Sequence, residues 1–221
     1  MMPIPHRAVL RPLPVAVLAF GLALTAIAPA ARAQDATPQP LAIGSAIPMA
    51  DAAMQGVDGK THTIASERGK KGTLVIFACN HCPYVKAWEE RMVALGNQWR
   101  SKGVGVIAIN ANDPEAFPED DLAGMQARAK QRGMKYAYVM DGTSDVARAF
   151  GATRTPEAFL FDAQGKLVYH GTVDDSPKDA GAVKDAWLRD AVNAVAAGKS
   201  VTTAETKAMG CSIKYRAKTT S

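Results

Sequence analysis

Short apolar runs alternate with longer amphipathic stretches through the middle of the chain. The runs 74–78 and 104–109 have the length and composition of buried strands. Between them, hydrophobic side chains recur at helical spacing from Pro83 to about Arg100, which predicts an amphipathic helix with Pro83 in its first turn. Strands and helices that alternate in this way form a partly parallel sheet that is covered by helices on both faces.

The remaining elements are predicted from the same patterns and from turn residues. Glycines, Pro48 and the turn Asp58-Gly59 predict short strands and a hairpin over residues 42–64. The later part of the chain predicts a helix from Pro118 to Gly133, a strand over 136–140, a short helix over 144–150, a hairpin over 157–170, and a last helix that begins at Ser176-Pro177 and ends at Gly198. The expected fold class is α/β, with a central mixed sheet, helices on both faces and an N-terminal β-hairpin extension.

The first 33 residues have the pattern of a signal peptide. His6, Arg7 and Arg11 give a positive start, and residues 15–28 are almost wholly apolar. Ala31-Arg32-Ala33 then has the small residues of a cleavage site, which predicts cleavage after Ala33. The apolar stretch is shorter than the roughly 20 residues of a membrane span, although an uncleaved anchor is the alternative. We therefore expect export, most simply to a bacterial periplasm.

Four segments are expected along the chain. After the signal peptide, residues 34–40 are rich in Pro, Gln and Ala and are expected to form a flexible leader. Residues 41–198 form one domain without an internal repeat. Residues 199–221 form a polar C-terminal tail, expected to be loosely packed, that contains Cys211.

The charge of the chain gives no support for a nucleic-acid partner. The 26 basic and 21 acidic residues amount to a formal net charge of +5. Three of the arginines and none of the acids lie in residues 1–33, so the charge of the remaining chain is close to neutral. No basic run is interleaved with aromatic residues, and no phosphate-binding glycine motif is present.

Two cysteines, in Cys79-Asn80-His81-Cys82, follow a predicted strand and precede a predicted helix. A helix N-terminus favours an anion, so a thiol placed there ionises more easily, and the thiolate is the nucleophile in disulfide exchange. A zinc site would need a second pair of ligands, and an inert disulfide would close only a short loop. A redox-active dithiol fits best, with Cys79 as the exposed nucleophile and Cys82 as the more buried resolving cysteine.

Asn80 and His81 are the candidates for tuning this dithiol. A cationic His81 would add to the helix dipole, stabilise the Cys79 thiolate and make the disulfide a stronger oxidant. The alternative is a solvated histidine at a loop tip. The other two histidines of the predicted domain, His62 and His170, are interpreted as surface or hairpin residues.

Several stretches together carry a resemblance to a known family. They are residues 77–86, Asn112-Asp113, 155–162, 165–169 and 210–214. In this combination the chain resembles the thioredoxin superfamily, and specifically its exported, peroxiredoxin-like redoxin branch, over roughly residues 44–175.

The resemblance implies a thioredoxin-like fold and adds two residues to the site. Pro156 would be the cis-proline that faces the dithiol, with Thr155 before it. The backbone beside that proline would pair with an extended substrate peptide, which is strand addition in physical terms. Two departures argue against thioredoxin-like reductase tuning: Thr73 replaces a buried aspartate, and Ala78 replaces the tryptophan before the first cysteine. The histidine before the second cysteine instead resembles a strongly oxidising DsbA-type dithiol.

The expected function is that of a periplasmic thiol–disulfide oxidoreductase. Its Cys79/Cys82 dithiol would exchange disulfides with protein or small-molecule thiols, without a cofactor or a metal, and a membrane or periplasmic redox partner is expected. Arg154 could steady a thiolate or lie on the surface. Cys211 could resolve an intermediate formed at Cys79, pair between chains or remain a free thiol on the tail.

Two alternative functions remain at this point. One is a peroxiredoxin-like thiol peroxidase with an antioxidant role, although the Pro-x-x-x-Thr-x-x-Cys frame of a peroxidatic cysteine is not reproduced around Cys79 or Cys82. The other is a copper-handling protein similar to the Sco-type chaperones, which have a longer spacing between the cysteines and a distant histidine where this chain has Thr155-Pro156.

Overall fold

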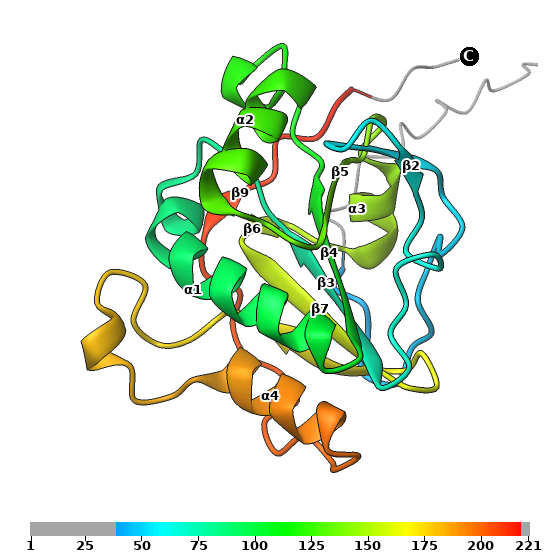
Figure 1. Cartoon of the computed structure of the whole chain (residues 1–221), viewed down its shortest axis with the longest axis vertical. Helices are drawn as coiled ribbons and strands as arrows, with labels where there is room; N and C mark the ends of the chain where they lie inside the picture. The colour runs from blue at the N-terminus through cyan, green and yellow to red at the C-terminus, as the bar shows by residue number, and fades with distance from the viewer. Residues whose placement is uncertain (1–38, 218–221) are drawn as a thin grey trace, which may run out of the picture. The chain divides into compact units, whose positions relative to one another are not determined.

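The computed structural model describes residues 39–217 of the chain (Figure 1). The predicted signal peptide and nearly all of the predicted leader lie outside these residues. The elements are β1 (Met54–Gly56), β2 (Thr61–His62), β3 (Gly72–Phe77), α1 (Pro83–Ser101), β4 (Val104–Asn110), the 3₁₀ turn η1 (Pro118–Asp120), α2 (Leu122–Arg132), β5 (Ala137–Met140), α3 (Asp145–Phe150), β6 (Arg154–Thr155), β7 (Glu157–Asp162), β8 (Leu167–Gly171), the 3₁₀ turn η2 (Ala180–Ala182), α4 (Trp187–Ala196) and β9 (Cys211–Ser212).

Seven of the strands form one mixed sheet in the order β2-β1-β5-β4-β3-β7-β8. The strands β3, β4 and β5 run parallel to their neighbours within this group, whereas β7 and β8 continue the sheet antiparallel. The hairpin of β1 and β2 adds to the free edge of β5. The predicted α/β architecture, including the N-terminal hairpin, is therefore confirmed.

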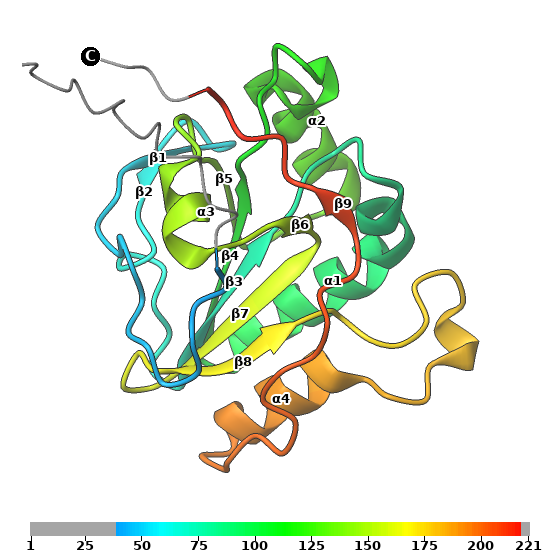
Figure 2. The ribbon, with the colours of Figure 1, turned by 180° about the vertical axis from the view of Figure 1, so that it is seen from behind.

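The central strand β3 is buried on both faces because it lies between two apolar layers. Leu74 and Ile76 belong to one hydrophobic cluster, and Val75 and Phe77 belong to the other, as the two-residue repeat of a strand requires. The first cluster is covered by α1, α2 and α4, and the second is covered by α3. Figures 1 and 2 show α1 and α4 on one side of the sheet and α3 on the other.

The helices begin and end close to where the sequence predicts, with two exceptions. Pro118 begins the 3₁₀ turn η1, and α2 follows only from Leu122, with Asp121 as its capping residue. The helix α1 confirms the prediction, and Gly133 ends α2 in the left-handed conformation with φ of 64°. The helix α4, however, begins at Trp187, so the prediction that Ser176-Pro177 opens it is wrong. Arg91 donates hydrogen bonds to the carbonyl oxygens of Ser176 and Pro177, at 2.8 and 2.7 Å, and these bonds hold that segment as a loop.

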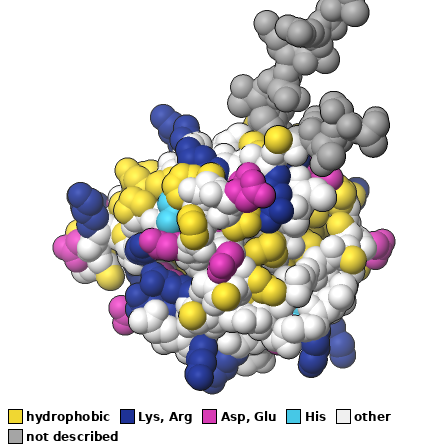
Figure 3. All heavy atoms as spheres, turned by 90° about the horizontal axis from the view of Figure 1, so that it is seen from above, with side chains coloured by type: hydrophobic (Ala, Val, Ile, Leu, Met, Phe, Trp, Pro, Cys, Tyr) yellow, Lys and Arg dark blue, Asp and Glu magenta, His cyan; other side chains and the backbone are white. Residues whose placement is uncertain are grey.

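The tail is more ordered than the sequence indicates. His170 exchanges backbone hydrogen bonds with residues 204–206, β9 pairs with β6, and Ile213 is buried. Within residues 39–217, no helix is both long enough and apolar enough to cross a membrane. On the face in Figure 3, basic and acidic side chains are interspersed with hydrophobic ones.

Candidate active site

The two cysteines lie where β3 leads into α1. Cys82 is the residue that caps the N-terminus of α1, with Pro83 in the first turn, and Cys79 comes three residues earlier in the connecting loop. The sequence predicted an exposed Cys79, and this prediction is wrong: Cys79 is 2% exposed and Cys82 0%. Cys79 is covered because it packs into the hydrophobic cluster beneath α1 and against Thr155.

The loop that contains Thr155 lies directly against both sulfur atoms. The Thr155–Pro156 peptide bond is cis. The Thr155 Oγ1 atom lies 3.3 Å from Cys79 Sγ, and the Thr155 carbonyl oxygen accepts a hydrogen bond from the Cys82 thiol at 3.1 Å. The structure therefore brings together four residues that the sequence predicted for the site, which are Cys79, Cys82, Thr155 and Pro156. Arg154, by contrast, has an exposed side chain on the solvent side of this loop.

The two thiols ionise as a pair. A hydrogen bond from Cys79 lowers the pKa of Cys82 to about 4, and further hydrogen bonds from Cys211 and from the backbone of Val85 act in the same direction. The same bond to Cys82 raises the pKa of Cys79, as do burial and the charge of Asp120. The first negative charge therefore rests on Cys82, which is the reverse of the assignment expected from the sequence.

This ionisation predicts how the stability of the reduced protein varies with pH. Because the pKa of Cys82 falls from 9.0 to about 4 in the folded state, ionisation stabilises the folded form. This contribution is complete above about pH 9 and is lost as the pH falls toward about 4. We expect the unfolding free energy of the reduced protein, measured relative to the Cys82→Ser variant, to rise between these values. A difference that does not vary with pH would contradict the assignment.

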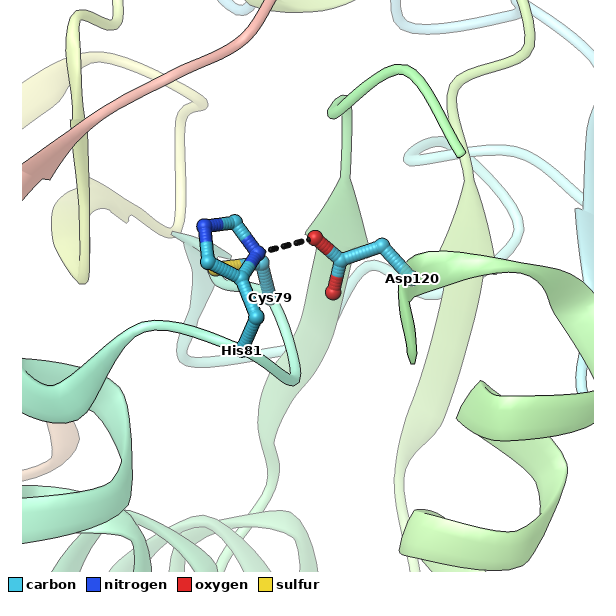
Figure 4. Close-up of side chains that lie close together, drawn as sticks. All are labelled: Cys79, His81 and Asp120. Atoms are coloured by element: carbon cyan, nitrogen blue, oxygen red, sulfur yellow. Dashed lines mark hydrogen bonds and ion pairs between the residues drawn. The ribbon is translucent and has the colours of Figure 1, made fainter. Parts of the chain in front are cut away.

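Asp120 is a site residue that sequence reasoning missed. It is fully buried at the end of η1, and it accepts hydrogen bonds from the backbone of Asn80 at 2.6 Å and from the Asn112 side chain at 2.8 Å. Its Oδ2 atom also lies 2.5 Å from Nδ1 of His81 (Figure 4). Asp120 therefore fastens the loop between the two cysteines to a segment about forty residues away.

His81 and Asn80 are both held in fixed positions by this contact. The His81 ring stacks on Phe117 with 4.0 Å between ring centroids, so His81 is not a solvated residue at a loop tip. The Asn80 side chain donates to the Glu119 carbonyl oxygen and accepts from the Tyr138 hydroxyl. When His81 carries a proton, the carboxylate of Asp120 offsets its charge, which weakens the effect on Cys79 that the sequence suggested.

One group of three side chains has the donor atoms that a metal ion would need. The ligand atoms of Cys79, His81 and Asp120 lie within 4.8 Å of one another. Sulfur, imidazole nitrogen and carboxylate oxygen are ligands that zinc accepts. Asp120, the third donor, lies in η1, about forty residues after the two cysteines, so no regular ligand spacing in the sequence indicates this group.

A buried pair beneath the Thr155 loop was also missed. His170 is 6% exposed and lies 2.7 Å from Oε1 of Glu157, so it is not a surface residue, although it does lie in the β7–β8 hairpin. The other carboxylate oxygen of Glu157 accepts from the backbone of Thr153 at 2.7 Å and of Arg154 at 2.8 Å. Glu157 thereby fixes the segment that precedes Thr155.

The fold and the site define a class of protein: a thioredoxin-like domain with two cysteines at the start of its first helix. Residues 42–186 match the Redoxin family, and the chain belongs to that family. Two solved structures are similar over most of the chain. A hypothetical protein from Sinorhizobium meliloti is 35% identical, with a TM-score of 0.75, and the match covers 81% of this chain and 98% of that one. An uncharacterized conserved protein from Geobacillus kaustophilus is 36% identical, with a TM-score of 0.74, over 79% and 93% of the two chains.

Curated relatives are more distant. The thiol-disulfide oxidoreductase ResA of Geobacillus thermodenitrificans is 26% identical over 58% of this chain and 67% of its own length. The ResA of Halalkalibacterium halodurans is 25% identical over 52% of this chain and 61% of its own. A thioredoxin-like protein solved in its oxidised form, at 19% identity and a TM-score of 0.55, confirms the fold.

Proposed function

We propose that the protein is a thiol–disulfide oxidoreductase whose Cys79/Cys82 dithiol oxidises the thiols of proteins or small molecules. The observation that carries this proposal is the contact between two cysteines at a helix N-terminus, one of which has a strongly lowered pKa. The names of the curated relatives support the same class of reaction.

The difference in pKa between the two thiols favours attack on Cys79. In the oxidised protein, a substrate thiolate would attack Cys79 Sγ, forming a mixed disulfide and releasing Cys82 as a thiolate. Cys82 is the better leaving group because its pKa is the lower of the two, and thiols of low pKa leave faster. A second substrate thiolate then attacks the substrate sulfur of the mixed disulfide and releases Cys79, which takes up a proton. The substrate gains a disulfide, and the dithiol is reduced.

The pKa values also favour the oxidising direction. An ionised Cys82 stabilises the reduced form of the dithiol, and a protein whose reduced form is stabilised is a strong oxidant. Such an enzyme would act in an oxidising compartment, in agreement with the signal-peptide pattern of residues 1–33. We therefore include a periplasmic location, and a redox partner there that restores the disulfide, in the proposal.

The proposal predicts catalysed oxidation of a reduced, unfolded test protein. We expect the oxidised wild-type protein to transfer its disulfide rapidly, and the Cys79→Ser/Cys82→Ser double variant to transfer none. The Gly142→Ala variant is the control, since nothing lies within 4 Å of its added Cβ atom and all three thiols are kept. Transfer by the double variant at the wild-type rate would refute the proposed function.

A further inference from the structure

The third cysteine lies beside the dithiol. Cys211 is in β9, which pairs antiparallel with β6, and its register partner is Thr155. Thr155 is the residue that contacts the sulfur atoms of Cys79 and Cys82. Cys211 packs against the same hydrophobic cluster and lies close enough to Cys82 for each thiol to shift the pKa of the other. Figure 2 shows β9 lying along β6.

The tail is held in this place by close backbone contacts. Ile213 donates to the Thr153 carbonyl oxygen at 2.9 Å, and the Lys214 carbonyl oxygen accepts from Asp113 at 2.7 Å. Gly210 approaches Thr155 so closely that an added Cβ atom would lie 2.1 Å from the Thr155 carbonyl oxygen. Only glycine permits this approach, so the position of Cys211 depends on Gly210.

The three thiols differ in accessibility and in charge. Cys79 and Cys82 are buried, whereas Cys211 is only partly buried. Burial and the neighbouring Cys82 raise the pKa of Cys211 to about 11, so it faces the Cys82 thiolate as a neutral thiol. An external disulfide therefore reaches Cys211 more easily than it reaches the dithiol.

We propose that Cys211 is a third redox-active cysteine, which forms a disulfide with Cys82 and passes oxidising equivalents from an external disulfide to the Cys79/Cys82 pair. This inference rests on the proposed function of the dithiol. Cys82 then has two alternative disulfide partners, Cys79 and Cys211, and the tail is part of the active site.

The relay consists of three exchange steps. Cys211 gives up its proton and attacks the external disulfide, which forms a mixed disulfide and releases one external thiol that takes up this proton. The Cys82 thiolate then attacks Cys211 Sγ, which forms the Cys82–Cys211 bond and releases the second external thiolate. Cys79 attacks Cys82 Sγ, which closes the Cys79–Cys82 disulfide and returns Cys211 as a thiol. In sum, the external disulfide is reduced to one thiol and one thiolate, and the one proton comes from Cys79, because Cys82 starts as a thiolate; the second thiol forms by uptake of a proton from water.

The test is to trap the Cys82–Cys211 disulfide in the Cys79→Ser variant. The reduced variant is treated with oxidised glutathione, blocked with an alkylating agent and digested with trypsin. Cleavage after Lys71, Lys86, Lys207 and Lys214 places Cys82 in peptide 72–86 and Cys211 in peptide 208–214. We expect these two peptides to be joined, with at least about tenfold more cross-link than in the Cys82→Ser variant, because β9 places Cys211 opposite Thr155, whose carbonyl oxygen accepts the hydrogen bond from Cys82.

Two glycine variants test the position of the tail without removing Cys82 or Cys211. In the Cys79→Ser background, Gly210→Val is expected to lower the yield of cross-link severalfold, because its side chain would meet the backbone of Thr155 and Pro156. Gly142→Ala is the control, since nothing lies within 4 Å of its added Cβ atom. Equal yields in both glycine variants would overturn the role of the tail.

The outcomes separate this inference from the proposed function. Glutathione that remains attached to Cys82 or Cys211, with no joined peptides, would overturn the relay even if the dithiol proves active. Joined peptides support the relay by direct chemical detection, whatever the activity on a test protein. In the wild-type background, Cys211→Ser is further expected to slow reoxidation of the dithiol by oxidised glutathione by about tenfold.

Discussion

Replacing Cys82 by serine is expected to stop turnover and to leave Cys79 joined to its substrate in a stable mixed disulfide. The reason is that the Cys79–Cys82 disulfide, which the substrate thiolate attacks, can no longer form, and that a Cys79 joined to a disulfide reagent has no Cys82 thiolate beside it to displace the reagent. We expect the turnover of disulfide exchange to fall by roughly a hundredfold or more, since the pair can no longer store a disulfide to transfer.

The experiment requires that Cys211 be removed from both variants. The Cys82→Ser/Cys211→Ser protein is mixed with a small aromatic disulfide and is compared with the Cys79→Ser/Cys211→Ser protein by mass spectrometry. A mixed disulfide is expected mainly with the first, because the loss of Cys82 removes the largest cause of the raised pKa of Cys79, whereas the loss of Cys79 removes the hydrogen bond that lowers the pKa of the buried Cys82. If both proteins form the mixed disulfide to the same extent, the assignment of Cys79 as the sulfur that joins the substrate is contradicted.

The second large effect is expected from Asp120→Asn. The charge of Asp120 opposes a negative charge at the hydrogen-bonded Cys79/Cys82 pair, so its removal is expected to favour the single thiolate of the reduced pair and to shift the reduction potential toward a stronger oxidant. The substitution also leaves a buried donor without its acceptor, so we expect it to lower the unfolding free energy by about 1–3 kcal/mol.

A neighbouring carboxylate provides the control for Asp120. Glu119→Gln removes the same charge one residue earlier, but the Glu119 side chain is 65% exposed and its partner, Lys86, lies at the surface. We expect Glu119→Gln to leave both the reduction potential and the unfolding free energy close to their wild-type values. If the two variants shift the potential equally, the buried position of Asp120 has no special effect on the dithiol.

The sequence predicted the elements that carry the dithiol because their signals are local. The apolar run of β3 and the helical spacing of α1 lie on either side of the cysteines, and Pro83 is suited only to the first turn of a helix. These patterns depend on neighbouring residues alone. The strand, the helix and the position of the dithiol between them could therefore be read from the chain before the structure was known.

The rest of the site depends on contacts between distant residues, which leave no periodic signal. Asp120 resembles any acidic residue in a first helical turn, yet the chain turns it inward to meet Asn80 and His81. The tail is polar in composition, and only its pairing with β6 shows that it belongs to the site. Because β9 occupies the edge of Thr155, a substrate peptide could pair there, as the family resemblance implies, only after the tail moves away.

The central claim is that Cys79 and Cys82 form a redox pair whose reduced form is stabilised by the Cys82 thiolate. The most direct test is to equilibrate the protein, as a Cys211→Ser variant, with glutathione buffers and to measure the reduction potential of the pair. The structure predicts a potential well above that of thioredoxin, toward the roughly −120 mV of a strong oxidant. A value near −270 mV, which is typical of a thioredoxin-like reductant, would contradict it.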